Sequence, residues 1–341
     1  MSIFSSDQPE QTFVDLLTSE ITFKARLRIL IGGGTGFVGK ALTSYLVSKG
    51  HRVTVISRNR YQYGFNYFVS WDENPDADTV TWGEIEREGL PRSMDVVINL
   101  AGTSIMDFKK LWTCRFKEKC VTSRVNTTAL LAKAISESKE PPSVWIATSA
   151  VSLYPPSKTI EYGEGDGHGG SDDHWASQLC ASIEEAAKLS DEEKCPRSVI
   201  MRLGIVLGQD GGVYDNMHMP FYCCLGGTIG DGSQWFPYVH LKDVVRAYEF
   251  AVFDTRARGP LNVVAPSACT NKEFTLALGS AMWRPTFIPV PSFVTQLMGE
   301  ERASLLFEGQ QVQPNALKSM GFEFNFPDIT SCCKDLVSKK K

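Results

Sequence analysis

The segment GGGTGFVG at residues 32–39 has the residue types and spacing to bind a phosphate group. Three of its glycines stand three residues apart. The first permits a tight turn, the second lets the backbone approach a pyrophosphate, and the third lets a helix pack closely on a strand. A helix that begins here also offers unpaired N–H groups to the anion. The pattern predicts a dinucleotide site; the alternative is that the glycines serve only a turn. The expected contacts are Gly33, Thr35, Gly36, Phe37, Val38 and Gly39.

The elements around this segment are those that such a site requires. Residues 27–31 (LRILI) form a β-rich run, and residues 52–58 (RVTVISR) form another. Between them, apolar residues at helical spacing continue to Val47, and Gly50 ends the predicted helix. A strand, a glycine-rich turn, a helix and a second strand within about 30 residues make a βαβ unit. This context favours a phosphate-binding role for the glycines.

The end of the second predicted strand indicates which dinucleotide binds. A site for NAD usually places Asp or Glu here, because a carboxylate accepts a hydrogen bond from the ribose 2′-OH. This chain has Ser57 and Arg58 instead. A carboxylate would repel a 2′-phosphate, whereas guanidinium and hydroxyl groups can hold one. We therefore predict NADP(H) as the cofactor, with Arg58 as the main contact and Ser57 beside it. The alternative is that Arg58 is a solvated charge at a strand end.

A second stretch of small residues is expected to contact the cofactor. Asn99, Leu100, Ala101 and Gly102 close an apolar run, MDVVINLAG, that begins at Met94. Small residues at the carboxyl edge of a sheet let the adenine and ribose approach the backbone. We predict that this edge forms one wall of the cofactor site, with a plain turn from strand to loop as the alternative.

Strands and helices continue to alternate as far as residue 207. Further strands are expected at 78–82, 94–102, 143–150 and 197–207, and helices at 111–120, 124–136 and 172–189. This order predicts an α/β fold of the Rossmann type, a doubly wound parallel sheet with right-handed crossovers.

The pattern changes after residue 207, which indicates a second, smaller lobe. Residues 208–232 are rich in glycine with few helix or strand signals, so we expect a loop that faces a ligand. A helix at 241–253 and a strand at 260–265 are expected to return to the core. The predicted division is an N-terminal extension (1–25), a Rossmann NADP-binding core (26–207, rejoined by about 236–265), and a substrate lobe (208–235 and 266–338) that includes a small C-terminal domain.

Composition excludes several classes of function. The formal net charge is −4, so the chain lacks the basic surface that a nucleic acid requires. No apolar run approaches 18 residues, so we expect no membrane partner. Nine cysteines without a CxxC pair predict reduced thiols and no metal site. Residues 1–25 contain acidic residues and no apolar signal segment, so we expect a cytoplasmic protein, with a mitochondrial one as the alternative.

Several of these segments together resemble a known family. They are RILIGGGTGFVG, VTWGEIEREGLP, DVVINLAGTSI, SRVNTTALLAKAI, MRLGIVLGQDGG, LGGTIGDGSQWFPYVHLKD and RGPLNVVAPSACTNKEF. The chain looks like an atypical extended short-chain dehydrogenase/reductase, and more narrowly it resembles the family 39U epimerase-like proteins. The segment from Phe287 to Pro314 is similar to the small C-terminal domain of that family. The resemblance implies a Rossmann core, NADP binding and an ancestry among nucleotide-sugar epimerases, but no particular substrate.

The catalytic pattern of that wider superfamily is incomplete here. There, a Ser or Thr at the end of the fifth strand positions the substrate, and a Tyr about 25 residues on, with Lys four residues later, supplies the proton. Ser149 matches the first part, with Thr148 beside it as a cofactor contact. Counting forward leads to His174 and Trp175, where neither Tyr nor Lys stands. His174 is either a substitute acid or an exposed loop histidine.

The pattern Tyr-x-x-x-Lys does occur once near Ser149, at an unexpected spacing. Tyr154 and Lys158 fit Tyr-x-x-x-Lys, but Pro155 and Pro156 lie between them and would break the helix that brings such a pair together. We therefore expect no standard pair, and the candidate catalytic residues are Ser149 and Tyr154.

Two functions stay open. The first is an NADP(H)-dependent oxidoreductase or epimerase that acts on an unknown small substrate. The second is a catalytically silent NADP(H)-binding scaffold or redox sensor that acts through a protein partner, and it is motivated by the missing pair. A homodimer formed by the helices at 111–136 and 172–189 is a further candidate, because this architecture commonly dimerises there.

Overall fold

A computed structural model describes residues 26–58, 77–105, 110, 112–166, 174–190, 195, 197–209, 211–289 and 308–338. The predicted N-terminal extension lies outside the described residues, as do the loop at 59–76, His168 and the stretch 290–307 of the expected C-terminal domain.

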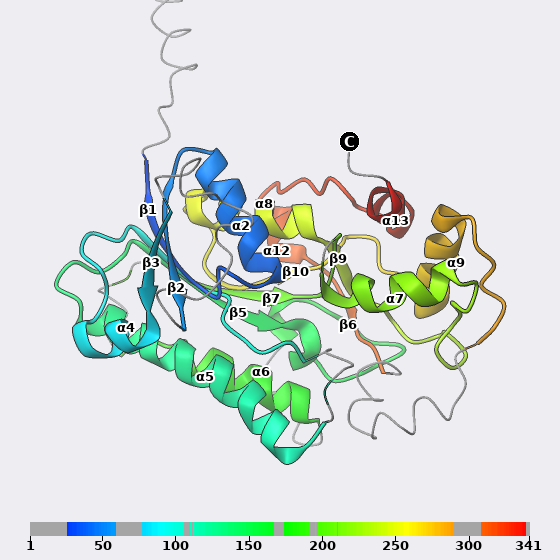
Figure 1. The fold of residues 1–341 in the computed structure, drawn as a ribbon, viewed down its shortest axis with the longest axis horizontal. Helices are drawn as coiled ribbons and strands as arrows, with labels where there is room; N and C mark the ends of the chain where they lie inside the picture. Colours follow the sequence, from blue (N-terminus) through cyan, green and yellow to red (C-terminus); the bar gives the residue numbers. More distant parts are fainter. Residues whose placement is uncertain are drawn as a thin grey trace, which may run out of the picture.

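A seven-stranded parallel sheet forms the centre of the described chain (Figure 1). Its strands, in spatial order, are β10 (Gly259–Val263), β7 (Ser198–Leu203), β5 (Val144–Ala150), β4 (Val96–Asn99), β1 (Arg28–Gly32), β2 (Arg52–Ser57) and β3 (Ala77–Thr81). Each neighbouring pair is parallel. The order reverses between β1 and β4, and ligands bind outside the carboxyl ends of strands at such a switch point. The predicted doubly wound parallel sheet is confirmed.

Helices cover both faces of the sheet (Figure 1). They are α2 (Phe37–Ser48) and α8 (Leu241–Phe253) on one face, and α4 (Trp82–Glu88), α5 (Cys114–Glu137) and α6 (Trp175–Ala186) on the other. Ile29 and Ile31 of β1 pack in the core that α2 and α8 cover, whereas Leu30 packs in the core that α4 and α5 cover. All three side chains are fully buried, which explains why the strand is apolar without alternation.

Further elements lie outside the seven-stranded sheet. They comprise α7 (Gly212–Tyr222), α9 (Asn271–Met282), α13 (Ile329–Val337), the 3₁₀ turns Val151–Leu153 and Glu164–Asp166, and two separate strand pairs, β8 (Ile205–Leu207) with β9 (Tyr238–His240) and β6 (Glu161–Tyr162) with β11 (Gln311–Val312). The short helix α12 (Asn315–Ser319) instead packs in the main core, through Leu317. Phe221 of α7, Phe274 of α9 and Leu336 of α13 share a separate apolar core. The division of the chain into a Rossmann core and a substrate lobe stays a prediction.

The structure has one helix, α5, where the sequence predicts two, at 111–120 and 124–136. Phe116, Cys120 and Thr128 are all buried and stand four or eight residues apart, so one buried stripe continues through the gap between the predicted helices. Packing against the sheet therefore outweighs the weak helix propensity of the residues between them.

The glycine-rich stretch at 208–232 is not a continuous loop, because α7 occupies half of it. Tyr214 and Phe221 are buried seven residues apart against the apolar core with α9, and this packing stabilises a helix that contains Pro220. The strand predicted at 197–207 is also divided, at Gly204. A Cβ atom there would lie 2.5 Å from the carbonyl oxygen of Pro237, and the chain leaves the sheet at that point to pair β8 with β9.

A buried carboxylate on α8 holds the C-terminal segment against that helix. Asp243, on α8, is fully buried, and its two oxygens accept hydrogen bonds from the backbone N–H groups of Asn325 (2.8 Å) and Phe326 (2.9 Å). Arg246, one turn later, lies 3.3 Å from the same carboxylate. Next to it, His240 caps α8 by accepting the backbone N–H of Lys242 at its Nδ1 atom. Both residues therefore serve the fold.

None of the helices that the structure describes is both long enough and apolar enough to cross a membrane.

The substitution Asp243→Asn should lower the free energy of unfolding by about 2 kcal/mol, because an amide can accept at only one of the two positions and leaves a buried N–H group unpaired. Urea unfolding followed by circular dichroism measures the change. Glu88→Gln is the matched control, because Glu88 and Arg87 form a solvent-exposed ion pair. This substitution should change the free energy of unfolding by about 0–1 kcal/mol. Equal losses in the two variants would contradict this role of Asp243.

Candidate functional site

A continuous cavity of about 710 Å³ opens along the carboxyl edge of the sheet. Residues that follow β1, β4, β5 and β7 line one side of it. Residues from α6, from α7 and from two segments at 229–237 and 308–310 line the other. The cavity therefore lies at the switch point of the sheet, where elements outside the seven-stranded sheet meet it.

The glycine turn between β1 and α2 forms one end of this cavity. Gly33 has a φ of +76°, and a Cβ atom on it would lie 2.6 Å from the backbone of Leu100. A Cβ atom on Gly39 would lie 2.2 Å from the carbonyl oxygen of Gly33. Packing of the turn on α2 and on the end of β4 thus demands both glycines.

Gly36 differs from the other two, because it faces open space. A Cβ atom on it would meet only the carbonyl oxygen of Gly33, at 3.3 Å, and its φ of −78° suits any residue. It is the N-cap residue of α2 and is exposed. The protein itself thus leaves an unfilled place at the positive end of a helix, which is where an anion is stabilised.

The end of β4 is held against the glycine turn by a buried amide. Asn99 donates from Nδ2 to the hydroxyl of Thr128 (2.9 Å) and accepts the backbone N–H of Ala101 at Oδ1 (3.0 Å). The backbone N–H of Leu100 donates to the carbonyl of Gly32 (2.8 Å). Leu100, Ala101 and Gly102 line the cavity as a result, whereas Asn99 supports that wall from behind.

The two residues predicted to select the dinucleotide lie at the same edge of the sheet. Ser57 ends β2, one residue after the partner of Gly32 in the neighbouring strand, and Arg58 follows it with an exposed side chain. Neither is among the described residues that line the 710 Å³ cavity. Their position is beside the glycine turn, on the β2 side.

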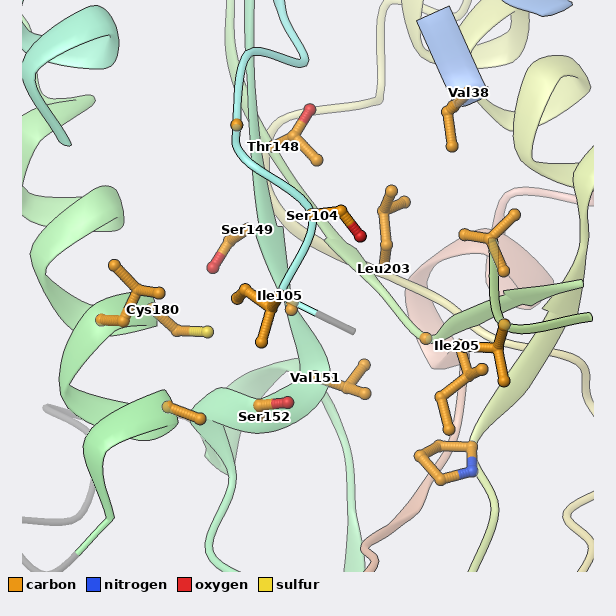
Figure 2. A pocket seen from close by; sticks show the side chains of 18 of the residues that line it. Val38, Ser104, Ile105, Thr148, Ser149, Val151, Ser152, Cys180, Leu203 and Ile205 are labelled. Carbon is orange, nitrogen blue, oxygen red and sulfur yellow. The ribbon is translucent and has the colours of Figure 1, made fainter. Parts of the chain in front are cut away.

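Thr148 and Ser149 end β5 and both line the cavity (Figure 2). The hydroxyl of Thr148 shares a hydrogen bond of 2.6 Å with the phenol of Tyr248, a fully buried residue of α8. Ser149 is 5% exposed, and no nitrogen or oxygen atom of the described residues hydrogen-bonds its Oγ atom, which interacts with the thiol of Cys180. A buried hydroxyl without a nitrogen or oxygen partner is costly, and it is a group that a bound ligand would satisfy.

The side chain of Ser149 points toward Cys180 of α6 (Figure 2). Burial raises the pKa of the Cys180 thiol to about 11, although the backbone of Ala150 offsets part of this effect. The thiol is therefore neutral near pH 7. The site around Ser149 thus contains a buried hydroxyl whose neighbour is an uncharged thiol.

Tyr154 and Lys158 do not form a pair. The phenol of Tyr154 is fully buried, donates to Asn262 Oδ1 (2.8 Å) and accepts from the guanidinium of Arg202 (2.8 Å). Burial raises the pKa of this phenol despite the adjacent Arg202. The ammonium group of Lys158 instead donates to Ser233 (2.9 Å). Tyr154 is not among the described residues that line the cavity. It belongs to a polar cluster with Arg202 of β7 and Asn262 of β10.

His174 reaches the cavity at the start of α6, where it is the N-cap residue. Its Nδ1 atom lies 3.9 Å from a carboxylate oxygen of Glu308, which lines the cavity from the C-terminal segment. Sequence reasoning did not single out Glu308, nor Arg124 and Cys180, which also line the cavity. No local pattern marks these three, because α5, α6 and the C-terminal segment meet only in the folded chain.

Within the described part of the chain, no group of three or more His, Cys, Asp or Glu side chains could hold a metal ion.

A doubly wound sheet with a glycine turn and a cavity at its switch point defines a dinucleotide-binding protein of the Rossmann class. The chain belongs to the NAD dependent epimerase/dehydratase family, whose model matches residues 29–263. Residues 290–336 match a domain of unknown function, DUF1731.

Close relatives support the narrower resemblance. The Epimerase family protein SDR39U1 of mouse is 42% identical, over 92% of this chain and 100% of the relative, and that of cattle is 40% identical over the same shares. The crystal structure of human SDR39U1 (isoform 2) with NADPH has a TM-score of 0.83 at 39% identity, over 91% of this chain and 99% of that one. The resemblance to family 39U epimerase-like proteins is confirmed.

The geometry of the turn predicts losses of stability of different size for two similar substitutions. Gly39→Ala should destabilise the protein by about 1–3 kcal/mol or more, because the added methyl group overlaps the carbonyl oxygen of Gly33. Gly36→Ala should cost about 1 kcal/mol or less, through a weaker helix cap. Thermal unfolding of the two variants without ligand measures both, and a larger loss for Gly36→Ala would contradict this account of the turn.

Proposed function

We propose that the protein binds NADP(H) at the carboxyl edge of its sheet and acts there as an oxidoreductase or epimerase on a small substrate. The observation that carries the proposal is the single cavity that runs from Gly36, at the start of α2, past Ser149 to the segment 229–237. Its volume of about 710 Å³ is in the range of cofactor and small-molecule sites. The human relative crystallised with NADPH supports the choice of cofactor.

The residues at the turn fit such a dinucleotide. The open place above Gly36, at the N-terminus of α2, suits a pyrophosphate. Ala101 and Gly102 form a wall of backbone and small side chains for a ribose. Arg58 and Ser57, beside the turn, would hold the 2′-phosphate that distinguishes NADP(H) from NAD(H). When bound, NADP(H) supplies hydride exchange at its nicotinamide ring.

The protein's own groups around Ser149 would orient and protect the substrate. The Ser149 hydroxyl, which no nitrogen or oxygen atom of the described residues hydrogen-bonds, would donate to a carbonyl oxygen of the substrate or exchange a hydrogen bond with its hydroxyl group. Apolar side chains line the same cavity, with Ile105 near Ser149 and with Leu203 and Ile205 across the cavity from it (Figure 2). His174, paired loosely with Glu308, is the imidazole positioned to exchange a proton at the cavity.

A second candidate function is a silent NADP(H) sensor that acts through a protein partner. The observation that favours it is that no Tyr and no Lys is among the described residues lining the cavity. The Tyr-Lys pair that the superfamily resemblance implies is thus not assembled from these residues. Both functions require dinucleotide binding, and turnover separates them.

The substitution Arg58→Ala should weaken NADPH binding about tenfold to a hundredfold, because it removes charged hydrogen bonds to the 2′-phosphate. NADH binding, which has no such phosphate to lose, should not change. Fluorescence titration of each nucleotide measures both. Arg52→Ala is the matched control, since Arg52 is also exposed but begins β2 at the opposite edge. Equal NADPH affinities in the wild type and Arg58→Ala would remove Arg58 from the site.

The substitution Ser149→Ala should slow turnover at least a hundredfold, for any substrate that a screen of NADPH consumption identifies, because one donor to the reacting oxygen is lost. NADPH affinity should stay the same. Ser152→Ala is the control, since Ser152 lines the same cavity one turn further on. Full activity in Ser149→Ala would refute the role of Ser149. Tight NADPH binding without turnover of any carbonyl or hydroxyl substrate in the screen would favour the sensor.

A further inference from the structure

Arg124 brings a cationic group to the wall of the cavity. It lies on α5, and its Nη1 atom donates to the backbone carbonyl of Cys120 one turn earlier (3.3 Å). The titratable groups that affect the pKa of Arg124 are the thiols of Cys120 and Cys180, and burial raises the pKa of both thiols, so they are neutral near pH 7. No carboxylate of the described residues is among the groups that affect this pKa.

The position of the guanidinium group is set by the backbone at the end of β4. A Cβ atom on Gly102 would lie 2.8 Å from Cζ of Arg124, so the glycine makes room for the side chain. The Arg124 side chain is half-buried, and this burial lowers the pKa of its guanidinium group. A partly desolvated cation with neutral partners is unfavourable on its own. An anion that binds the guanidinium group would offset the cost of this lost hydration.

Ser149 provides an independent sign of a ligand at the same place. It is 95% buried, and no nitrogen or oxygen atom of the described residues hydrogen-bonds its hydroxyl, which has only a weak interaction with the thiol of Cys180. Cys180 is a neighbour that it shares with Arg124: the Ser149 side chain points toward Cys180 (Figure 2), and the thiol of Cys180 acts on the charge of Arg124. The ends of β4 and β5 and the helices α5 and α6 therefore bring a cation and a buried hydroxyl to one region.

We propose that Arg124 is the substrate-binding cation and that the substrate is a small carboxylic acid. Its carboxylate would lie on the guanidinium group, whose planar, two-donor edge matches a carboxylate. Its carbonyl or hydroxyl would lie at Ser149, and its apolar part against Leu203 and Ile205. This proposal rests on the proposed function, because it names the class of substrate for the same site.

The alternative source of the anion is a phosphate of the dinucleotide, and the arrangement of helices argues against it. The open place at Gly36 begins α2, which covers one face of the sheet. Arg124 belongs to α5, which covers the opposite face, and its neighbour Cys180 lies on α6. Arg58 is also on the β2 side of the turn. The phosphates would thus find their partners away from Arg124.

The test compares carboxylates with neutral amides of the same shape. Acetate, butyrate and benzoate, each against its primary amide, are titrated into the full-length protein with and without saturating NADP⁺, followed by calorimetry. At least one carboxylate should bind about tenfold or more tightly than its amide. Arg124→Gln should abolish that preference, and Arg124→Lys should keep part of it. Arg115→Gln is the matched control, since Arg115 is an exposed residue of the same helix and should change nothing.

Separate NADPH titrations of each variant distinguish the failures. The proposal is overturned if no carboxylate binds the wild type better than its amide, or if the preference survives Arg124→Gln in a protein that still unfolds cooperatively. A tenfold loss of NADPH affinity in Arg124→Gln would also overturn it, because it would assign the anion to the dinucleotide. Failure of the wild type to bind NADPH would instead defeat the proposed function, while the titrations without NADP⁺ would still decide the carboxylate site.

Discussion

Contact between the glycine turn after β1 and the end of β4 is the constraint on which the site depends. The backbone at Gly33 comes so close to Leu100 that even a methyl group would overlap it. Asn99 fixes the end of β4, because its buried amide hydrogen-bonds both the backbone of Ala101 and the hydroxyl of Thr128. The start of α2 and the loop after β4 are therefore placed by one packed junction. The open position at Gly36 exists because its neighbours are fixed while nothing in the protein fills the space in front of it.

The cavity combines apolar walls with a small number of polar groups, which is the usual composition of a ligand site. Ile105, Leu203 and Ile205 supply apolar surface, while Ser149 and Arg124 supply a hydroxyl and a charge. Hydrogen bonds and ion pairs are stronger where water is excluded, so each of these polar groups has a larger effect than it would have at the surface. This arrangement suits a ligand whose polar groups are few and matched in position.

Other polar groups near the sheet serve the fold rather than the cavity. Arg202 on β7 forms a bidentate ion pair with Glu184 (2.8 Å at each contact) and donates a hydrogen bond to the phenol oxygen of Tyr154. Asp243 accepts two backbone N–H groups of the C-terminal segment. These residues have protein partners for their charges. The contrast with Arg124, whose partners among the described residues are neutral, separates structural charge from a charge available to a ligand.

The sequence by itself determined the doubly wound parallel sheet and the glycine turn, because these depend on local patterns: an apolar strand, glycines at fixed spacing, and a helix that follows at once. It also predicts a role for Ser149 and the lack of a standard Tyr-Lys pair from positions along one stretch of chain, and both stay predictions. The sequence predicts two helices where α5 is one, and a loop where α7 forms, because burial against distant elements stabilises those helices. Only the tertiary structure decided that Tyr154 faces Arg202, and that Arg124, Cys180 and Glu308 reach the cavity. These residues lie on separate elements, and what each side chain can do depends on neighbours that the chain brings together only on folding.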